Sequence, residues 1–195
     1  MFKEHKGEML FIGFAMILYL VMAALDASQK FVYTAVLFGL FGLVIAWKLF
    51  ESVDDEPAGN EKMTEIADAI HEGAMVFLSR EYKMLGYFVG AVFILLLVLI
   101  SIQKGVWIGF WTAVAYAVGA GCSMLAGYFG MNAATTSGVR TSQAAADGGQ
   151  AKALNIAFNG GAVMGLCVAS LGLIGVGGLF ALFGRGDSIS VISGF

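Results

Sequence analysis

Three acidic residues stand side by side in the first polar segment of the chain, and grouped carboxylates are the side chains that hold hard cations. Asp54, Asp55 and Glu56 could in principle bind Mg²⁺, which takes carboxylate oxygens as ligands. Residues 57–60, Pro-Ala-Gly-Asn, follow at once and are typical of a turn. Because adjacent acids in a turn are more often hydrated than metal-bound, we interpret this group as a solvated turn.

A few other polar residues have types that suit chemistry. His71 could act as a base, but an interfacial histidine is the more common outcome at such a position. Arg140 and Asp147 lie among Thr, Ser and Gln and could contact an anion or a neighbouring loop, although a structural role in holding loops to a partner domain is favoured. Asn155 and Asn159 begin an apolar run, where amides commonly bond to a neighbouring helix and contribute about 0.6–2 kcal/mol.

The composition decides which class of protein carries these residues. Of 195 residues, 59% are hydrophobic and only 13% are charged, whereas soluble domains carry about 25% charged residues. This excludes a soluble enzyme, a nucleic-acid-binding protein and a disordered chain. Cys122 and Cys167 lie in apolar stretches far from a CxxC spacing, which predicts free thiols.

Five uncharged apolar runs approach or exceed the roughly 20 residues that cross a bilayer. They are Met9–Leu25, Phe31–Ala46, Met84–Ile102, Val106–Met131 and Ala153–Phe183. The first could instead be a cleaved signal peptide, since Met1–Lys6 is basic, but the run is longer than a usual signal core and Asp26 interrupts the cleavage region. We favour a retained helix, joined to the second by a tight link at Asp26–Lys30.

The segment before the third run has the periodicity of an amphipathic helix. From Glu61 onward, apolar residues recur at steps of three and four, with acids on the opposite side. The apolar positions are Met63, Ile66, Ile70, Ala74, Phe77 and Leu78. We expect this helix to continue directly into Met84–Ile102. The fold class is therefore an all-α integral membrane protein, with about five transmembrane helices plus a cytoplasmic amphipathic helix.

Small residues form two regular stripes that predict close helix packing. One stripe comprises Ala115, Gly119, Ser123 and Gly127, and the other Gly161, Gly165, Ala169 and Gly172. We expect a neighbouring helix to lie in the first groove. Between the two runs, an alanine-rich segment predicts a continued helix, with a break at Gly148–Gly149.

The distribution of Lys and Arg predicts the orientation. With five spans, eight basic residues fall on one side: Lys3, Lys6, Lys48, Lys62, Arg80, Lys83, Arg140 and Lys152. Three fall on the other: Lys30, Lys104 and Arg185. The positive-inside rule then places the amino terminus in the cytoplasm of a multi-pass protein of the cell membrane. Trp47 and Lys48 are typical interfacial anchors.

Two stretches carry a family resemblance. Residues Glu61–Lys83 contain Ile-His-Glu-Gly-Ala-Met-Val-Phe-Leu-Ser-Arg-Glu-Tyr-Lys, and residues Gly130–Ala146 contain Gly-Met-Asn-Ala-Ala-Thr-Thr-Ser-Gly-Val-Arg-Thr. A Lys-Ala-Leu-Asn-Ile-Ala-Phe-Asn-Gly-Gly segment begins at Lys152. Over roughly residues 35–185 the chain resembles the amino-terminal part of the membrane-bound, ion-pumping pyrophosphatases.

This resemblance implies an integral membrane enzyme that hydrolyses pyrophosphate on the cytoplasmic side and couples hydrolysis to export of H⁺ or Na⁺. It further implies a homodimer in the lipid bilayer with Mg²⁺ as cofactor, and metal-assisted phosphoryl transfer. Nucleic acid is not a partner.

The resemblance also implies a division of the chain. Residues 1–30 are an additional transmembrane helix and short loop, and residues 31–195 are the helical N-terminal part of the pump, truncated before its catalytic core. The family's Arg-Val-Gly-Gly-Gly and Asp-Asp-Asn-Val-Gly-Asp signatures are absent from this sequence, and no ionisable residue lies deep within a span. We therefore assign no catalytic, cofactor-binding or metal-binding residue, and expect an outer-helix scaffold that is inactive alone. The alternative is a small stand-alone oligomeric scaffold or channel subunit.

Overall fold

Four long helices make up most of the structure, a computed structural model that describes residues 13–18, 20, 27–183 and 191–195. They are α2 (Ala27–Asp54), α3 (Glu61–Lys104), α4 (Val106–Asp147) and α5 (Gln150–Phe183). Each is long and apolar enough to cross a membrane. The prediction of an all-α membrane protein is confirmed.

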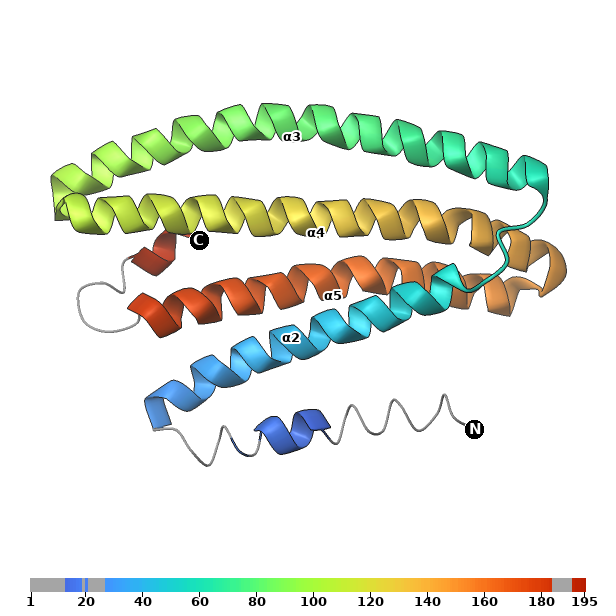
Figure 1. The fold of residues 1–195 in the computed structure, drawn as a ribbon, viewed down its shortest axis with the longest axis horizontal. Helices are drawn as coiled ribbons and strands as arrows, with labels where there is room; N and C mark the ends of the chain where they lie inside the picture. The colour runs from blue at the N-terminus through green and yellow to red at the C-terminus, as the bar shows by residue number, and fades with distance from the viewer. Residues whose placement is uncertain (1–12, 19, 21–26, 184–190) are drawn as a thin grey trace.

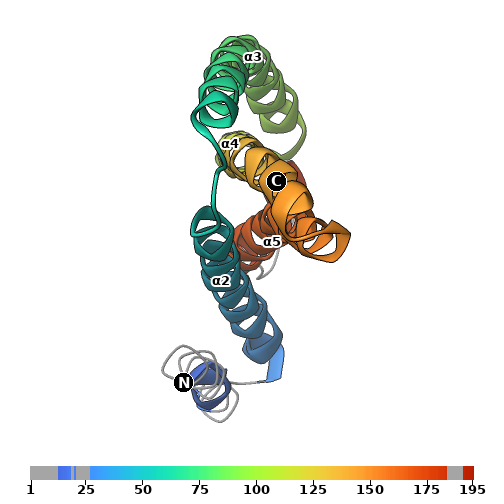
Figure 2. The ribbon, with the colours of Figure 1, turned by 90° about the vertical axis from the view of Figure 1, so that its right-hand side faces the viewer.

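The helices run alternately up and down in a row rather than around a shared centre (Figures 1 and 2). Helix α4 packs between α3 and α5, and α2 packs against the far side of α5 with a smaller contact to α4. Within the described part of the chain, α3 therefore contacts α4 and no other long helix. A row of this kind leaves membrane-facing surface open on both of its sides.

Helix α3 confirms the predicted fusion of an amphipathic segment with a transmembrane span. It has 44 residues, so at 1.5 Å per residue it is about 66 Å long, roughly twice the thickness of the hydrocarbon core. The uncharged run Met84–Ile102 fills the half that ends at Lys104, and residues 61–83 extend beyond the membrane. Asn60 begins the helix, and its side-chain oxygen accepts a hydrogen bond from the Met63 amide at 2.9 Å.

Helix α4 likewise continues past its apolar run, and the chain turns where the two glycines predicted a break. Helix α4 ends at Asp147, and Gly149 has a φ of 80°, which favours glycine. At the opposite end the α3–α4 turn is Gly105 alone, with a φ of 94°. Long antiparallel neighbours joined by such short turns must pack along their length.

Two predicted boundaries need comment. Helix α2 begins at Ala27, so the link predicted at Asp26–Lys30 is wrong from Ala27 onward, because those residues already extend the helix. The predicted first span, Met9–Leu25, lies largely outside the described residues. Residues 13–18 of it are helical, and the Phe14 ring stacks on Phe41 of α2 at a centroid distance of 4.1 Å.

The closest contact between α4 and α5 is made by small residues. On α4 the buried positions include Ala126, Gly130, Ala133, Ser137 and Ala144, and on α5 they include Gly160, Val163 and Cys167. A Cβ atom added at Gly160 would come within 2.6 Å of the Ser137 Cβ atom. Since lipid tails are as apolar as side chains, such close packing is what holds membrane helices together.

The predicted small-residue stripes are not the faces that form this seam. On α4 only Ala115 of its stripe is fully buried, and the seam uses Gly130 and Ser137 instead. On α5 an added Cβ at Gly161, Gly165 or Gly172 would meet nothing within 4 Å. Among the described residues, Phe195 approaches Gly119 of the first stripe and the Tyr82 hydroxyl approaches Gly127, so the expectation of a neighbouring helix in the first groove stays a prediction. Glycine is so frequent on both helices that more than one face has the spacing for close packing.

This geometry predicts opposite effects for two neighbouring substitutions. Gly160→Ala places a methyl group against the Ser137 side chain and should lower the stability of the chain in detergent by about 1–3 kcal/mol. Gly161→Ala has open space and should raise stability by about 0.5–1 kcal/mol through helix propensity. Thermal unfolding followed by circular dichroism measures both, and equal effects would contradict the seam.

Candidate functional site

The polar side chains gather at the end of the molecule where the α2–α3 and α4–α5 turns meet, and Arg140 of α4 is their centre. Its Nε atom donates to the carbonyl oxygens of Asp54 and Glu56 at 3.2 and 3.1 Å. Its Nη2 atom lies 2.9 Å from the Asp54 carbonyl oxygen and 2.6 Å from a carboxylate oxygen of the same residue. Its Nη1 atom donates to the Thr136 carbonyl oxygen at 3.0 Å.

The physical reason for an arginine here lies in the end of α2. The last carbonyls of a helix have no partner within that helix and carry partial negative charge. A guanidinium group offers several fixed donors at once, and Arg140 is only 15% exposed, so its charge is screened little by solvent. Arg140 therefore holds the α2–α3 turn against α4. These bonds lie within one chain, and the expected role in holding loops to a partner domain stays a prediction.

A second ion pair closes the same cluster. Lys152 of α5 lies 2.7 Å from the Glu56 carboxylate, and Gln143 donates to the carboxylate of Asp147. Asp147 thus bonds within its own helix, and the structure does not pair it with Arg140. The groups surround a cavity of about 190 Å³. Each basic group at this cavity already has an acidic partner, so the cluster acts as a clasp between two turns.

The three adjacent acids do not converge on a common point. Asp54 pairs with Arg140, and Glu56 pairs with Lys152. Across the ranges that the structure describes, no group of three His, Cys, Asp or Glu side chains is placed to hold a metal ion. The carboxylates of Asp54 and Glu56 therefore do not fit a Mg²⁺ site.

His71 connects α3 to α4. Its Nδ1 atom lies 2.8 Å from the Thr135 hydroxyl. That hydroxyl is also 3.1 Å from the carbonyl oxygens of Met131 and Asn132, to either of which it can donate. Because the Thr135 hydroxyl donates its only proton to one of these carbonyl oxygens, it accepts a hydrogen bond from His71, and we therefore assign the ring proton to Nδ1. This hydrogen bond holds the polar half of α3, residues 61–83, against α4, together with the bond that the Tyr82 hydroxyl donates to the Met124 carbonyl oxygen.

The two asparagines of α5 differ from expectation. Asn155 is exposed and Asn159 is half-buried. Neither makes the predicted side-chain hydrogen bond to another helix within the described residues. Both thiols are free, with Cys167 buried and Cys122 half-buried.

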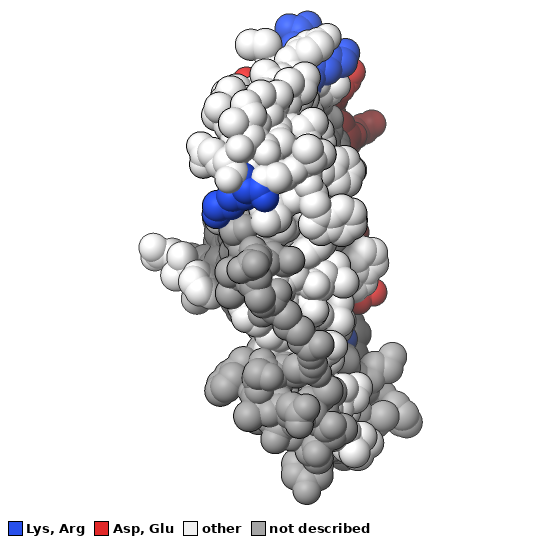
Figure 3. Space-filling view, turned by 90° about the vertical axis from the view of Figure 1, so that its left-hand side faces the viewer, with Lys and Arg blue, Asp and Glu red and all other residues white. Residues whose placement is uncertain are grey.

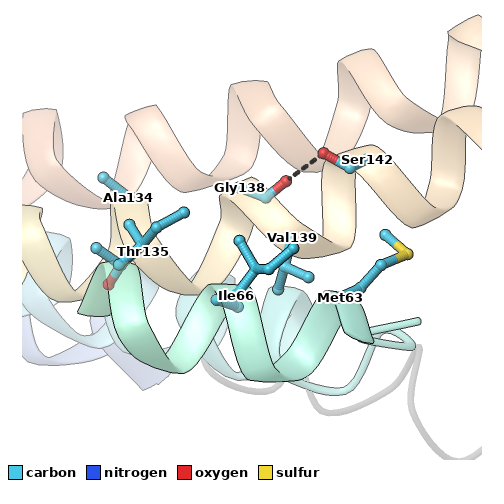
Figure 4. A pocket seen from close by; sticks show the side chains of 9 residues that line it. Met63, Ile66, Ala134, Thr135, Gly138, Val139 and Ser142 are labelled. Carbon is cyan, nitrogen blue, oxygen red and sulfur yellow. Dashed lines mark hydrogen bonds between the residues drawn. The ribbon is translucent and has the colours of Figure 1, made fainter. Parts of the chain in front are cut away.

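An apolar groove of about 490 Å³ lies between the first turns of α3 and the last third of α4 (Figure 4). Its α3 side is the predicted amphipathic face, with Met63, Ile66 and Ile70, and its α4 side includes Gly138 and Val139. Ile66 remains 59% exposed, so α4 covers this face only in part. The helical periodicity identified the α3 residues, but nothing in the local pattern of α4 indicated that it forms the opposite wall.

The fold and this clasp define a class: a multi-pass α-helical membrane protein whose polar residues tie together the helix ends at the α2–α3 and α4–α5 turns. Comparison with known families is specific. Residues 40–195 match the family described as inorganic H⁺ pyrophosphatase. The matched region contains the second half of α2 and the whole of α3, α4 and α5, and the chain belongs to this family.

Individual relatives are similar over most of this chain. A Clostridium tetani protein named as a K⁺-stimulated pyrophosphate-energized sodium pump is 46% identical over 138 residues, which cover 71% of this chain and 19% of the relative. A K⁺-insensitive pyrophosphate-energized proton pump of Methanosarcina mazei is 41% identical over 161 residues, 83% of this chain and 23% of the relative. A K⁺-stimulated pyrophosphate-energized sodium pump of Thermotoga maritima is 36% identical over 157 residues, which cover 78% of this chain and 20% of the relative. The chain thus spans about a fifth of the length of these relatives.

The clasp predicts how substitutions of Arg140 behave. Arg140→Ala removes all its bonds to Asp54 and Glu56 and should destabilise the chain by about 1–3 kcal/mol. Arg140→Lys should recover only part of this, because an ammonium group cannot span the same acceptors. Limited proteolysis at residues 55–60 should be slowest in the parent chain, faster in Arg140→Lys and fastest in Arg140→Ala.

Arg80→Ala is the matched control, because Arg80 is exposed on α3. It should leave both the unfolding midpoint and the cleavage rate within error of the parent chain. Equal cleavage of the Arg140 variants and the Arg80 variant would show that the clasp does not hold the turn.

Proposed function

We propose that this chain is the N-terminal, outer-helix segment of a pyrophosphate-energised ion pump. The complete pump hydrolyses pyrophosphate on the cytoplasmic side and couples hydrolysis to export of H⁺ or Na⁺. The observation that carries the proposal is the extent of the family match, which runs through the four-helix unit from residue 40 to residue 195. The match thus follows the unit that the α4–α5 seam and the Arg140 clasp hold together.

The role of the segment in the pump is that of a scaffold. Helices α3 and α4 extend well beyond the hydrocarbon on one side, and the side chains there bond to one another: Arg140 to the α2–α3 turn, His71 to Thr135, and Lys152 to Glu56. These contacts make a stiff wall beside the region in which the pump binds its substrate. Catalytic groups belong to the remaining part of the polypeptide. The complete pump is a homodimer.

Magnesium enters the proposal through the family. Bound Mg²⁺ neutralises phosphate charge and assists attack of water on phosphorus. Since Asp54 and Glu56 are engaged with Arg140 and Lys152, we assign the Mg²⁺ ligands to the rest of the pump.

The orientation follows from the charges. Lys48, Lys62, Arg80, Lys83, Arg140 and Lys152 fall on the side of the α2–α3 and α4–α5 turns, and Lys104 falls at the opposite end. That opposite end presents mostly uncharged side chains over its described part (Figure 3). The positive-inside rule then assigns the clasp to the cytoplasm. With residues 1–30 as an additional span, the amino terminus is cytoplasmic as well.

The test joins this chain to the remaining part of the Methanosarcina mazei pump, in place of the segment that it matches. Membranes carrying this chimaera should release phosphate from pyrophosphate when Mg²⁺ is present, and Arg140→Ala should lower the rate more than Arg80→Ala does. The purified 195-residue chain should give no hydrolysis under the same conditions. Hydrolysis by the chain alone would contradict the scaffold role, and an inactive chimaera would contradict membership of a working pump.

A further inference from the structure

Helix α3 lies at one edge of the row of helices, and one of its sides is not covered by any described part of the chain (Figure 1). Its long-helix contacts are with α4 alone, and none of its residues is fully buried. The Tyr82 hydroxyl bonds to α4 and so marks the side that faces the protein. Arg80, Met84 and Tyr87 lie on the opposite side, and Lys83 lies beside them, because steps of three, four and seven residues return to one helix face. We call these four residues the boundary face of α3.

The uncharged run of α3 determines the depth of the boundary face in a bilayer. Lys83 and Lys104 bracket 20 residues without a charge. At 1.5 Å per residue this run is about 30 Å long, which matches the thickness of the hydrocarbon core. When the run spans the core, Lys83 lies at the start of one headgroup layer, and Arg80 lies about 4.5 Å further out. That layer is roughly 5–7 Å deep, so both cations are at the level of the lipid phosphate groups.

Neither of these cations is neutralised by a described part of the protein. Across the described ranges, no ion pair involves Arg80 or Lys83, and both side chains are exposed. Helix α4 carries no charged residue from Val106 to Met131, so it brings no acid to this level. Glu81 follows Arg80 in the sequence but points about 100° around the helix. The level therefore keeps one net positive charge, with both cations on the side that α4 leaves open.

We infer that the boundary face binds the headgroup of an anionic phospholipid, in the leaflet on the side of the α2–α3 and α4–α5 turns. The Arg80 guanidinium offers paired donors that match a phosphate group, and the Lys83 ammonium adds a second positive charge. Tyr87 is 81% exposed and is a residue type that favours this interface. The acyl chains lie along the exposed apolar side chains that follow on α3, which include Ile94, Val98 and Ile102.

The charge and the position of the boundary face select this partner over others. A zwitterionic headgroup brings its own ammonium group close to the two cations, whereas an anionic headgroup supplies the single negative charge that the level lacks. A soluble anion would gain nothing from the apolar side chains that continue along α3 beside the cations. The inference needs only that α3 crosses a bilayer, and it stands apart from the hydrolytic activity proposed for the complete pump.

Native mass spectrometry of the 195-residue chain tests the site. The chain is purified in a non-ionic detergent and mixed with equimolar phosphatidylglycerol, which is anionic, and phosphatidylcholine, which is zwitterionic. We expect the parent chain to retain more phosphatidylglycerol than phosphatidylcholine. The double variant Arg80→Gln with Lys83→Gln should lower the ratio of the two bound lipids at least about fivefold, because one basic residue near an anionic surface changes binding by about that factor.

A second double variant is the matched control. Lys62→Gln with Lys104→Gln removes the same charge from two exposed side chains, one about 32 Å beyond Lys83 and one at the opposite end of the span. It should change the lipid ratio less than about twofold, and the exchange of Arg80→Lys with Lys83→Arg should keep the ratio of the parent chain. Thermal unfolding in lipid-free detergent should be the same for all of these variants, since the side chains are exposed.

The outcomes separate a lipid site from a general effect of charge. A loss confined to the Arg80 and Lys83 double variant, and absent from the charge-conserving exchange, supports the inference. Equal losses in the two double-glutamine variants would show that net charge alone sets the preference. A parent chain that retains both lipids equally would show no selectivity, and either of these results overturns the inference.

Discussion

The structure depends on one close contact, where Gly160 of α5 lies against Ser137 of α4. Because neither helix has a bulky side chain there, their backbones approach far enough for the pair to pack along most of its length. Helix α2 then packs on α5, and α3 packs on α4. The approach also determines where Arg140 lies, since it follows Ser137 by less than one turn of α4. From that position Arg140 reaches the end of α2, which is 86 residues earlier in the sequence.

This arrangement separates two kinds of surface. Beyond the membrane, the polar side chains bond to one another and fix the turns. Within the membrane, the row of helices leaves apolar faces that the described chain does not cover, among them one side of α3. Each such face meets lipid or another helix, and the basic pair Arg80 and Lys83 suits the boundary face of α3 to lipid. A chain that spans about a fifth of its relatives is expected to present surfaces that other helices complete.

Local sequence signals predicted the elements well. Apolar periodicity identified the fused helix α3, and Gly148–Gly149 identified the turn after α4, because both features act within a few residues. The contact between α4 and α5 uses other faces than the two predicted stripes. Gly161 has the same spacing signature as Gly160, and only the three-dimensional arrangement decides which of the two meets Ser137. Arg140 was expected to hold loops to a partner domain, but its acceptors are mostly backbone carbonyls of a distant turn of the same chain, which no side-chain pattern reveals.

The central claim, that the Gly160–Ser137 approach organises the helices, is tested most directly by exchanging the sizes of these two residues. The unfolding free energies of Gly160→Ala, Ser137→Gly and the double variant form a thermodynamic cycle. With the Ser137 side chain removed, the Ala133 carbonyl oxygen, 3.7 Å away, becomes the nearest neighbour of a Cβ atom at position 160, which is an ordinary van der Waals contact. The account predicts that the double variant recovers most of the stability that Gly160→Ala loses. Strictly additive effects of the two substitutions would contradict it.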